Sequence, residues 1–284
     1  MKTYLVYNPQ SKNNTGEDIL PKLKEIWRYK EFTLVDITST TYAEILADMS
    51  DDDELLVTGG DGTLYHLANG VDGDNLTKRI YFYPSGSGND FWNDVKEGKP
   101  DEPLLINDYL KQLPTVTVKG KTSRFVNGIG YGIDGYCCEE GDRLKEKSDK
   151  PINYTSIAIK GLLFHYKPTN ATVEVDGKKH HFKKCWLAPT MNGRFYGGGM
   201  MPAPEQDRLN TERTVTTMVM YGAGKIKTLI AFPSIFEGKH VEKTKLVSIF
   251  TGKHVKVSFD RPVALQIDGE TVLNVTEYEV NSAI

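Results

Sequence analysis

The first hundred or so residues alternate short apolar runs with longer segments of mixed polarity. Four runs have the length and apolar content of strands: Thr3–Asn8, Thr33–Ile37, Glu54–Thr58 and Ile80–Pro84. Three segments between them fit helices: Asp18–Tyr29, Tyr42–Met49 and Thr63–Val71. Alternation of strands and helices predicts a parallel sheet with helices on its faces.

The pattern changes after about Leu113. Short runs of alternating apolar and polar residues then follow one another, from TVTVKG at residue 115 to TVLNVTEYEV at residues 271–280. The Asp176-Gly177 pair inside this part is a strong hairpin signal, and only Gly141–Tyr166 interrupts the strands with a helical pattern. The chain therefore predicts an α/β domain over residues 1–114 and an all-β sandwich over residues 115–284, with a cleft between them.

Composition and charge narrow the class of protein. The formal net charge of −3 predicts no general attraction to nucleic acid. No apolar run approaches the ~18 residues of a membrane span, and the amino terminus lacks the pattern of a signal peptide. Three cysteines, two of them adjacent, cannot form a disulfide framework. We expect a cytoplasmic protein.

The most informative motif is TGGDGT at residues 58–63, which directly follows a predicted strand. Glycines at 59, 60 and 62 would let backbone N–H groups approach a phosphate at the end of the strand. The following helix would direct its positive end to the same place. Asp61 would then hold Mg²⁺ or orient an attacking hydroxyl, although a tight turn with an aspartate cap fits the same residues.

Two further loops lie at equivalent strand ends. NPQSKNNTG (residues 8–16) follows the first predicted strand, and PSGSGND (residues 84–90) follows the fourth. Each alone is an ordinary loop composition. Three such loops at one edge of a Rossmann-like α/β sheet favour a site for a phosphate tail.

These motifs resemble the diacylglycerol kinase catalytic-domain family, in which NPQS, GGDGT and PSGSGND occur in this order. The resemblance extends to FVNGIGYGIDG (residues 125–135), GGGMMPAP (residues 197–204) and LQIDGE (residues 265–270). It implies an α/β nucleotide domain followed by a β-sandwich, and transfer of the ATP γ-phosphoryl group to a lipid hydroxyl with Mg²⁺. The family is distantly similar to the sphingosine, NAD and phosphofructo-kinases.

The resemblance also implies roles for individual residues. The nucleotide site would be lined by Asn8, Pro9, Gln10, Ser11, Thr38, Gly59, Gly60, Asp61, Gly62, Thr63, Ser87 and Asn89. Glu270 matches the general base of bacterial members, whereas Asp61 has that role in the sphingosine-kinase branch and elsewhere joins Asp90 in a magnesium–water network. From the residues alone, the Asp-Gly before Glu270 indicates a hairpin turn.

Two departures from the family pattern keep alternatives open. Tyr65-His66 stands where the family often has Asn-Glu, and residues 209–211 read Leu-Asn-Thr where members with a structural magnesium site have Asp-Asp-Gly. One alternative is a kinase for a soluble acceptor such as NAD or a sugar phosphate. The other is a nucleotide-binding regulator without turnover. PSGSGND and QIDGE favour the lipid branch, and the intact Asp61, Asp90 and Glu270 argue against the regulator.

A lipid kinase without a spanning helix must reach its substrate from the inner membrane surface. INYTSIAIKGLLF (residues 152–164) and the basic residues before it are the candidate contact, namely Arg143, Lys145, Lys147 and Lys150. The sequence leaves the oligomeric state open, a homodimer included.

Overall fold

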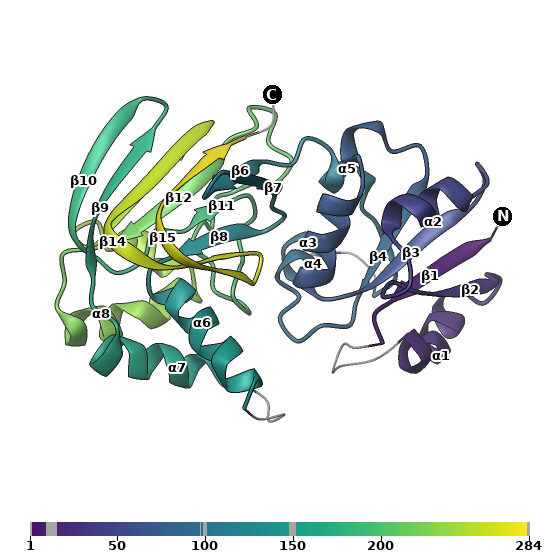
Figure 1. The fold of residues 1–284 in the computed structure, drawn as a ribbon, viewed down its shortest axis with the longest axis horizontal. Coiled ribbons are helices and arrows are strands. Elements are labelled where there is room, and N and C mark those ends of the chain that lie inside the picture. The colour runs from purple at the N-terminus through teal and green to yellow at the C-terminus, as the bar shows by residue number, and fades with distance from the viewer. Residues whose placement is uncertain (1, 10–15, 97, 99–100, 148–151, 283–284) are drawn as a thin grey trace. The chain divides into compact units, whose positions relative to one another are not determined.

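The structure is a computed structural model that describes residues 2–9, 16–96, 98, 101–147 and 152–282. The chain divides into two compact units, Met1–Leu113 and Pro114–Ile284 (Figure 1). Each unit has its own sheet and its own hydrophobic core, and each is described by itself.

The first unit is built on a five-stranded sheet of order β2-β1-β3-β4-β5. Its strands are β1 (Thr3–Tyr7), β2 (Phe32–Asp36), β3 (Glu54–Gly59), β4 (Arg79–Pro84) and β5 (Leu104–Leu105). β1 to β4 are parallel, and β5 pairs with β4 in the antiparallel direction. The parallel sheet predicted from the sequence is confirmed, with each predicted strand ending within one residue of the observed bounds.

The helices of the first unit are α1 (Gly16–Ile26), α2 (Tyr42–Asp48), α3 (Asp61–Gly70), η1 (Gly73–Asn75), α4 (Asp90–Val95) and α5 (Asn107–Leu110). α2 begins at a capping box, in which Thr41 and Glu44 exchange side-chain and backbone hydrogen bonds. α1 buries Ile19 and Leu23 against β1 and β3. The sequence did not predict α4 and α5, because helices this short show no complete apolar period.

The second unit is an antiparallel, β-sandwich-like domain, as predicted. Ten strands pair in the order β13-β12-β11-β8-β14-β15-β6-β7, with β9 on β14 and β10 on β9. They are β6 (Thr115–Val118), β7 (Lys121–Arg124), β8 (Gly128–Tyr131), β9 (Thr169–Val175), β10 (Lys178–Cys185), β11 (Thr190–Met191), β12 (Val215–Met220), β13 (Val247–Gly252), β14 (His254–Ile267) and β15 (Glu270–Asn281). The predicted Asp176-Gly177 turn joins β9 to β10, and both residues have positive φ.

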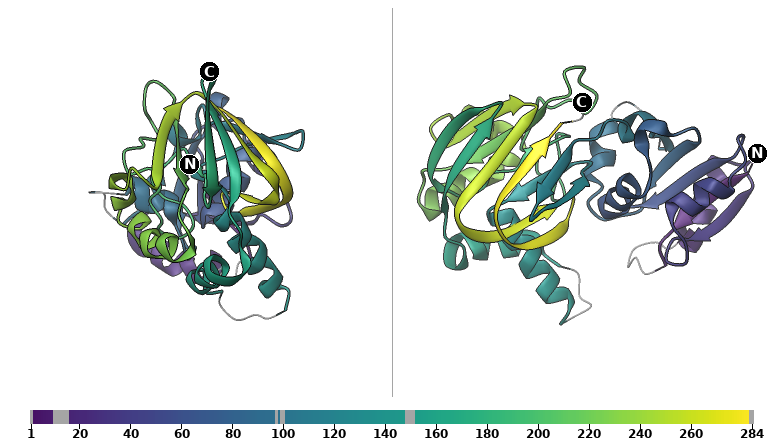
Figure 2. Two further views of the ribbon diagram at one scale, coloured as in Figure 1. Left: turned by 90° about the vertical axis from the view of Figure 1, so that its left-hand side faces the viewer. Right: turned by 45° about the horizontal axis from the view of Figure 1, so that its top comes forward.

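Helices gather along one side of this sheet (Figures 1 and 2). They are α6 (Ile133–Lys145), α7 (Tyr154–Lys160), the π-helical turn η2 (Gly161–His165), α8 (Lys225–Ala231), η3 (Phe232–Ile235) and η4 (Lys239–Glu242). The helical segment begins at Ile133, earlier than the predicted Gly141, where Gly135 lets the helix approach the backbone of β14. Across the described part of the chain, no helix is long and apolar enough to cross a membrane.

Candidate functional site

The four parallel strands of the first unit bring the predicted loops to one edge. Asn8 directly follows β1, Thr38 lies just beyond β2, and Gly59–Thr63 continue from β3. Ser87 and Asn89 lie in the loop between β4 and α4. Because parallel strands present their carboxyl ends at the same edge, these residues share one side of the sheet. Ligands of open α/β sheets bind at this edge.

The first loop is described only at its start. Asn8 is half-buried and Pro9 is exposed, while Gln10 and Ser11 lie outside the described residues. At the end of the neighbouring strand, Thr38 donates its backbone N–H and its hydroxyl to Asp36 Oδ1, at 2.8 and 2.7 Å. This bond pattern turns the chain back after β2 and leaves Thr38 exposed.

The glycines of the second and third loops lie backbone against backbone. Gly59 O accepts the N–H groups of Ser85 and Gly86 at 2.8 and 3.2 Å. A Cβ atom on Gly86 would lie 2.5 Å from Gly60 Cα, and one on Gly60 would lie 3.2 Å from Gly86 Cα. A Cβ atom on Gly59 would lie 2.1 Å from Thr63 Oγ1. The glycines are therefore required by packing within the protein, before any ligand is considered.

Asp61 joins the same two loops through its carboxylate. Oδ2 accepts the backbone N–H of Asp90, and Oδ1 accepts that of Phe91, each at 3.0 Å. Asp61 is the first residue of α3 and at the same time caps the amino terminus of α4. The aspartate cap that the sequence suggested is present, but it caps the helix after the next strand. The amino terminus of α4 is thereby occupied by Asp61, whereas the amino terminus of α3 at the same junction favours an anionic ligand.

Asn89 and Asp90 complete this junction. Asn89 has left-handed backbone angles (φ 53°, ψ 42°), and its Nδ2 donates to Gly86 O at 2.7 Å. Its Oδ1 is buried and has no hydrogen-bond partner among the described residues. Asp90 is buried beside Asp61, whereas Ser87 is exposed. The loop thus offers an acceptor, a hydroxyl and backbone N–H groups within a few residues.

The same junction holds the two carboxylates predicted to bind metal. Asp61 and Asp90 are neighbours through the bond of 3.0 Å between Asp90 N and Asp61 Oδ2. In the described ranges, no group of three His, Cys, Asp or Glu side chains could hold a metal ion. Mg²⁺ takes six oxygen ligands and usually keeps several waters, so two carboxylates beside a phosphate fit it better than a cage made of protein alone.

The DGE motif of the second unit forms the turn between β14 and β15. Asp268 and Gly269 have positive φ values of 48° and 98°, and Ile267 pairs with Glu270 across the turn. This confirms the hairpin predicted from the residues. Glu270 is exposed as the first residue of β15. The turn holds this carboxylate at a defined point on the surface of the unit.

Buried polar contacts fix the turn from below. Asp268 accepts the backbone N–H groups of Val126, Asn127 and Gly128 at 2.5, 2.8 and 3.0 Å. Arg208, which is also buried, donates to Val126 O and Asn127 Oδ1, both at 2.6 Å. No local pattern points to Arg208, because its partners lie more than eighty residues away.

The loop that departs from the family pattern is closed by a side-chain amide. Asn210 Oδ1 accepts Thr214 N at 2.9 Å, and Asn210 Nδ2 donates to Asp207 O at 2.7 Å. Asp207 Oδ1 accepts Leu209 N at 2.9 Å. This chain therefore closes the loop with the side-chain amide of Asn210 and the carboxylate of Asp207.

One buried carboxyl was missed by sequence reasoning. Asp134, at the start of α6, accepts the Tyr196 hydroxyl on Oδ2 at 3.0 Å, and its Oδ1 has no hydrogen-bond partner in the described part of the chain. A Cβ atom on Gly130 would lie 1.7 Å from Asp134 Oδ2, so only glycine leaves room for the carboxyl. Burial raises the pKa of Asp134 to about 7, and the hydrogen bond from Tyr196 opposes this rise only in part.

Comparisons with known proteins agree with these two units. Residues 2–118 match the diacylglycerol kinase catalytic domain, and residues 127–280 match the YegS C-terminal NAD kinase beta sandwich-like domain. The "Putative lipid kinase YtlR" of Bacillus subtilis is 24% identical over 250 residues, which cover 81% of this chain and 77% of that protein.

Two further relatives extend the comparison. A "Diacylglycerol kinase" of Mycobacterium tuberculosis is 25% identical over 197 residues, which cover 67% of this chain but only 62% of that protein. The crystal structure of a "putative diacylglycerol kinase" from Bacillus anthracis shares the fold, with a TM-score of 0.68 at 17% identity over 99% of this chain and 93% of that one. The chain belongs to the family that joins a diacylglycerol kinase catalytic domain to a YegS-type C-terminal domain.

Proposed function

We propose that this protein is an ATP-dependent phosphotransferase that transfers the γ-phosphoryl group of ATP to the hydroxyl of a lipid such as diacylglycerol. The observation that carries the proposal is the junction of the two glycine loops at the carboxyl edge of the first sheet. Family membership supports the same reaction class. In this proposal residues 1–114 bind the nucleotide and residues 115–284 bind the acceptor.

The nucleotide phosphates would lie against the loop junction. Glycines 60 and 86 keep side chains out of this junction, and the amino terminus of α3 begins there at Asp61. The Asn89 Oδ1 atom, which is unpaired among the described residues, would accept a hydrogen bond from the nucleotide or from a metal-bound water. The remaining loop residues implied by the family resemblance would complete the site: Asn8, Pro9, Gln10, Ser11, Thr38, Gly59, Gly62, Thr63 and Ser87.

Asp61 and Asp90 are the residues that would hold Mg²⁺, directly or through water. When bound, the ion would neutralise the phosphate oxygens during transfer. Because both Asp61 oxygens already accept a backbone N–H, we expect its share of the ligand shell to be small.

We propose Glu270 as the general base. Taking up a proton at Asp61 would weaken the two hydrogen bonds that cap α4, whereas Glu270 is exposed on a turn that Asp268 anchors. The acceptor hydroxyl would give its proton to the Glu270 carboxylate as its oxygen attacks the γ-phosphorus, and ADP would leave.

The experiment that tests this proposal is transfer of label from [γ-³²P]ATP to separate acceptors. Diacylglycerol in detergent micelles, a total lipid extract, NAD and a sugar phosphate are compared at equal concentration. We expect a labelled phospholipid and no labelled NAD or sugar. Label on NAD or the sugar would move the assignment to a soluble acceptor. ATP binding without transfer to any acceptor would favour a regulator.

A further inference from the structure

The second unit exposes an unusual amount of large apolar surface in one place. Phe164 on η2 is 72% exposed, and Ile226 and Ile230 on α8 are 71% and 75% exposed. Only Tyr29, in the first unit, is more exposed among the large hydrophobic residues that the structure describes. Scattered apolar side chains at a surface are ordinary, but a group of this kind marks an interaction site.

These side chains belong to elements that touch one another. α8 packs against η2, and Lys225 Nζ at the start of α8 donates to Leu163 O in η2 at 2.7 Å. Ile226 and Ile230 are four residues apart and so lie on one face of α8. α7 runs directly into η2 and adds Ile159, which is also exposed. Figures 1 and 2 show α7 and α8 as neighbours at one side of the unit. We call Ile159, Phe164, Ile226 and Ile230 the apolar patch.

The two segments that carry the apolar patch contain charged residues of one sign only. Segments 152–167 and 221–236 contain four lysines and no aspartate or glutamate, in a chain whose net charge is −3. Ion pairs that the structure describes involve none of these four: Lys160, Lys167, Lys225 and Lys227. A surface that combines exposed apolar side chains with unopposed lysines is typical of contact with anionic lipid.

The basic residues that precede this region are arranged differently. On α6, Arg143 pairs with Glu140 at 2.5 Å and Lys145 with Asp142 at 3.0 Å. These i, i+3 pairs neutralise much of the basic cluster that the sequence suggested for membrane contact. Lys150, a member of that cluster, lies outside the described residues. The four lysines beside the apolar patch lie instead on α7, on α8 and at Lys167, two residues after η2.

We propose that the apolar patch and its four lysines dock this protein on an anionic lipid bilayer. Phe164, Ile226 and Ile230 would enter the boundary between headgroups and acyl chains, and the lysines would lie among the lipid phosphates. A second copy of the chain fits the patch poorly, because a two-fold interface would set lysines against lysines. The choice of a lipid partner rests on the proposed function, since a lipid acceptor has to be reached at a bilayer surface.

The test is cosedimentation with vesicles in the absence of nucleotide. Vesicles of phosphatidylcholine with one third phosphatidylglycerol are compared with vesicles of phosphatidylcholine alone, at low and at high salt. We expect binding to the anionic vesicles that weakens as salt rises. The double variant Ile226→Gln/Ile230→Gln should bind at least about tenfold more weakly, because burial of each isoleucine contributes roughly that factor. Lys227→Gln should weaken binding by a smaller factor.

The matched control is Tyr29→Gln, which removes a fully exposed aromatic ring far from the patch in sequence and should leave binding unchanged. Turnover with micellar diacylglycerol is measured in parallel. Lost vesicle binding with retained micellar turnover supports docking. Patch-dependent vesicle binding without turnover on any lipid would refute the proposed function and retain the docking surface. Absence of wild-type binding at low salt, or equal binding by the double variant, would overturn the docking surface.

Discussion

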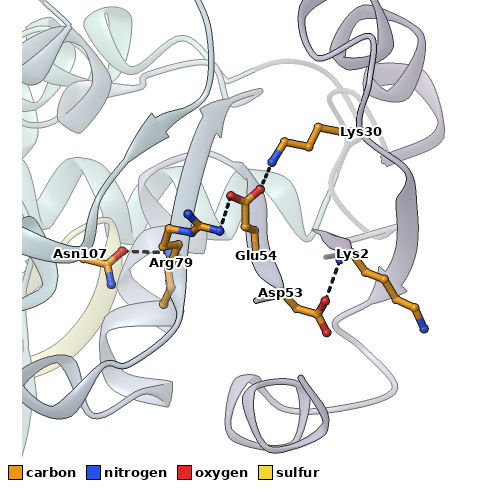
Figure 3. A network of polar contacts seen from close by, with 7 residues as sticks. Lys2, Lys30, Asp53, Glu54, Arg79 and Asn107 are labelled. Carbon is orange, nitrogen blue, oxygen red and sulfur yellow. Dashed lines mark hydrogen bonds and ion pairs between the residues drawn. The ribbon is translucent and has the colours of Figure 1, made fainter. Parts of the chain in front are cut away.

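The amino-terminal and carboxyl-terminal ends of the strands in the first sheet form two edges, and different kinds of contact stabilise each edge. At the amino edge, Glu54 is only 2% exposed and pairs with Lys30 and, at 3.1 Å, with Arg79 (Figure 3). Beside it, Asp53 accepts Lys2 N at 2.7 Å. At the carboxyl edge, the contacts are made by glycine backbone and by one carboxylate, Asp61, that accepts backbone N–H groups.

This difference indicates that the amino edge contributes to the stability of the fold and the carboxyl edge to ligand binding. Carboxylates at the amino edge pair with cations and backbone groups of the fold, so removing one partner should destabilise the protein. Glycines at the carboxyl edge keep side chains away, so a phosphate could approach the backbone of the loops and the amino terminus of α3. We therefore expect substitutions at the two edges to change different measurements.

The largest expected effect separates Asp61 from Glu270. Asp61 joins two loops at the carboxyl edge of the sheet, whereas Glu270 is proposed to take the proton. Glu270→Gln should therefore lower turnover by roughly 10²–10⁴-fold with unchanged ATP affinity and melting temperature. Asp61→Asn should lower the melting temperature as well as the ATP affinity, because one of its two capping acceptors becomes a donor. Turnover in steady state and calorimetry of ATP binding measure both. Near-normal turnover in Glu270→Gln would indicate that Asp61, and not Glu270, is the general base.

The next effect tests backbone contact at the carboxyl edge. Gly86→Ala places a Cβ atom 2.5 Å from Gly60 Cα, so the loops must separate. We expect ATP affinity to fall, because the loop backbone that would meet the phosphates is displaced. Turnover should fall about 100-fold, since a misplacement of about 1 Å can have this cost in rate. The control is Gly224→Ala, whose Cβ atom would meet nothing within 4 Å and whose φ is −79°. An ATP affinity within threefold of wild type would show that the contact between Gly60 and Gly86 is not needed for ATP binding.

A smaller effect is expected at the amino edge. Glu54→Gln leaves Lys30 and Arg79 without their partner and should lower the free energy of unfolding by about 1–3 kcal/mol, discounted because both cations reach solvent. ATP affinity should not change. Asp51→Asn removes the ion pair that this fully exposed carboxylate makes with Lys78, and should lower the free energy of unfolding less than Glu54→Gln does. Urea unfolding measures both variants. A Glu54→Gln protein with wild-type stability but weak ATP binding would contradict the division between the edges.

The smallest effect concerns Asp134. Its buried carboxyl is bonded to the neutral hydroxyl of Tyr196, whereas Glu54 pairs with cations and Asp61 accepts backbone N–H groups. Its pKa is about 7 in the folded chain against an ordinary value of 3.8, so the folded state holds the proton more tightly. This stabilisation is complete at low pH, is lost as pH rises through about 7, and is absent above it. Asp134→Asn removes the titrating group. Between pH 5 and pH 8 the free energy of unfolding of the wild type should therefore fall by about 1–2 kcal/mol relative to that of the variant. Urea unfolding across this range measures the difference, and a difference that does not change with pH would refute it.

Local sequence patterns determined much of the secondary structure of this protein. The periodicity of apolar residues predicted the four parallel strands and the change to antiparallel strands near residue 113, because each strand buries residues that are neighbours in the sequence. Turn chemistry predicted the hairpins at Asp176-Gly177 and Asp268-Gly269, because few residues tolerate positive φ. The glycine motifs predicted which strand ends lie together, since parallel strands share a carboxyl edge.

Only the tertiary structure decided which polar groups meet. Asp61 caps a helix that begins 29 residues later, and Asp268 holds backbone groups about 140 residues earlier in the chain. The apolar patch joins segments 152–167 and 221–236, whose packing no local period encodes. Hydrogen bonds and surface patches of this kind depend on how sheets and helices pack in three dimensions, whereas periodicity and turn propensity act over a few residues.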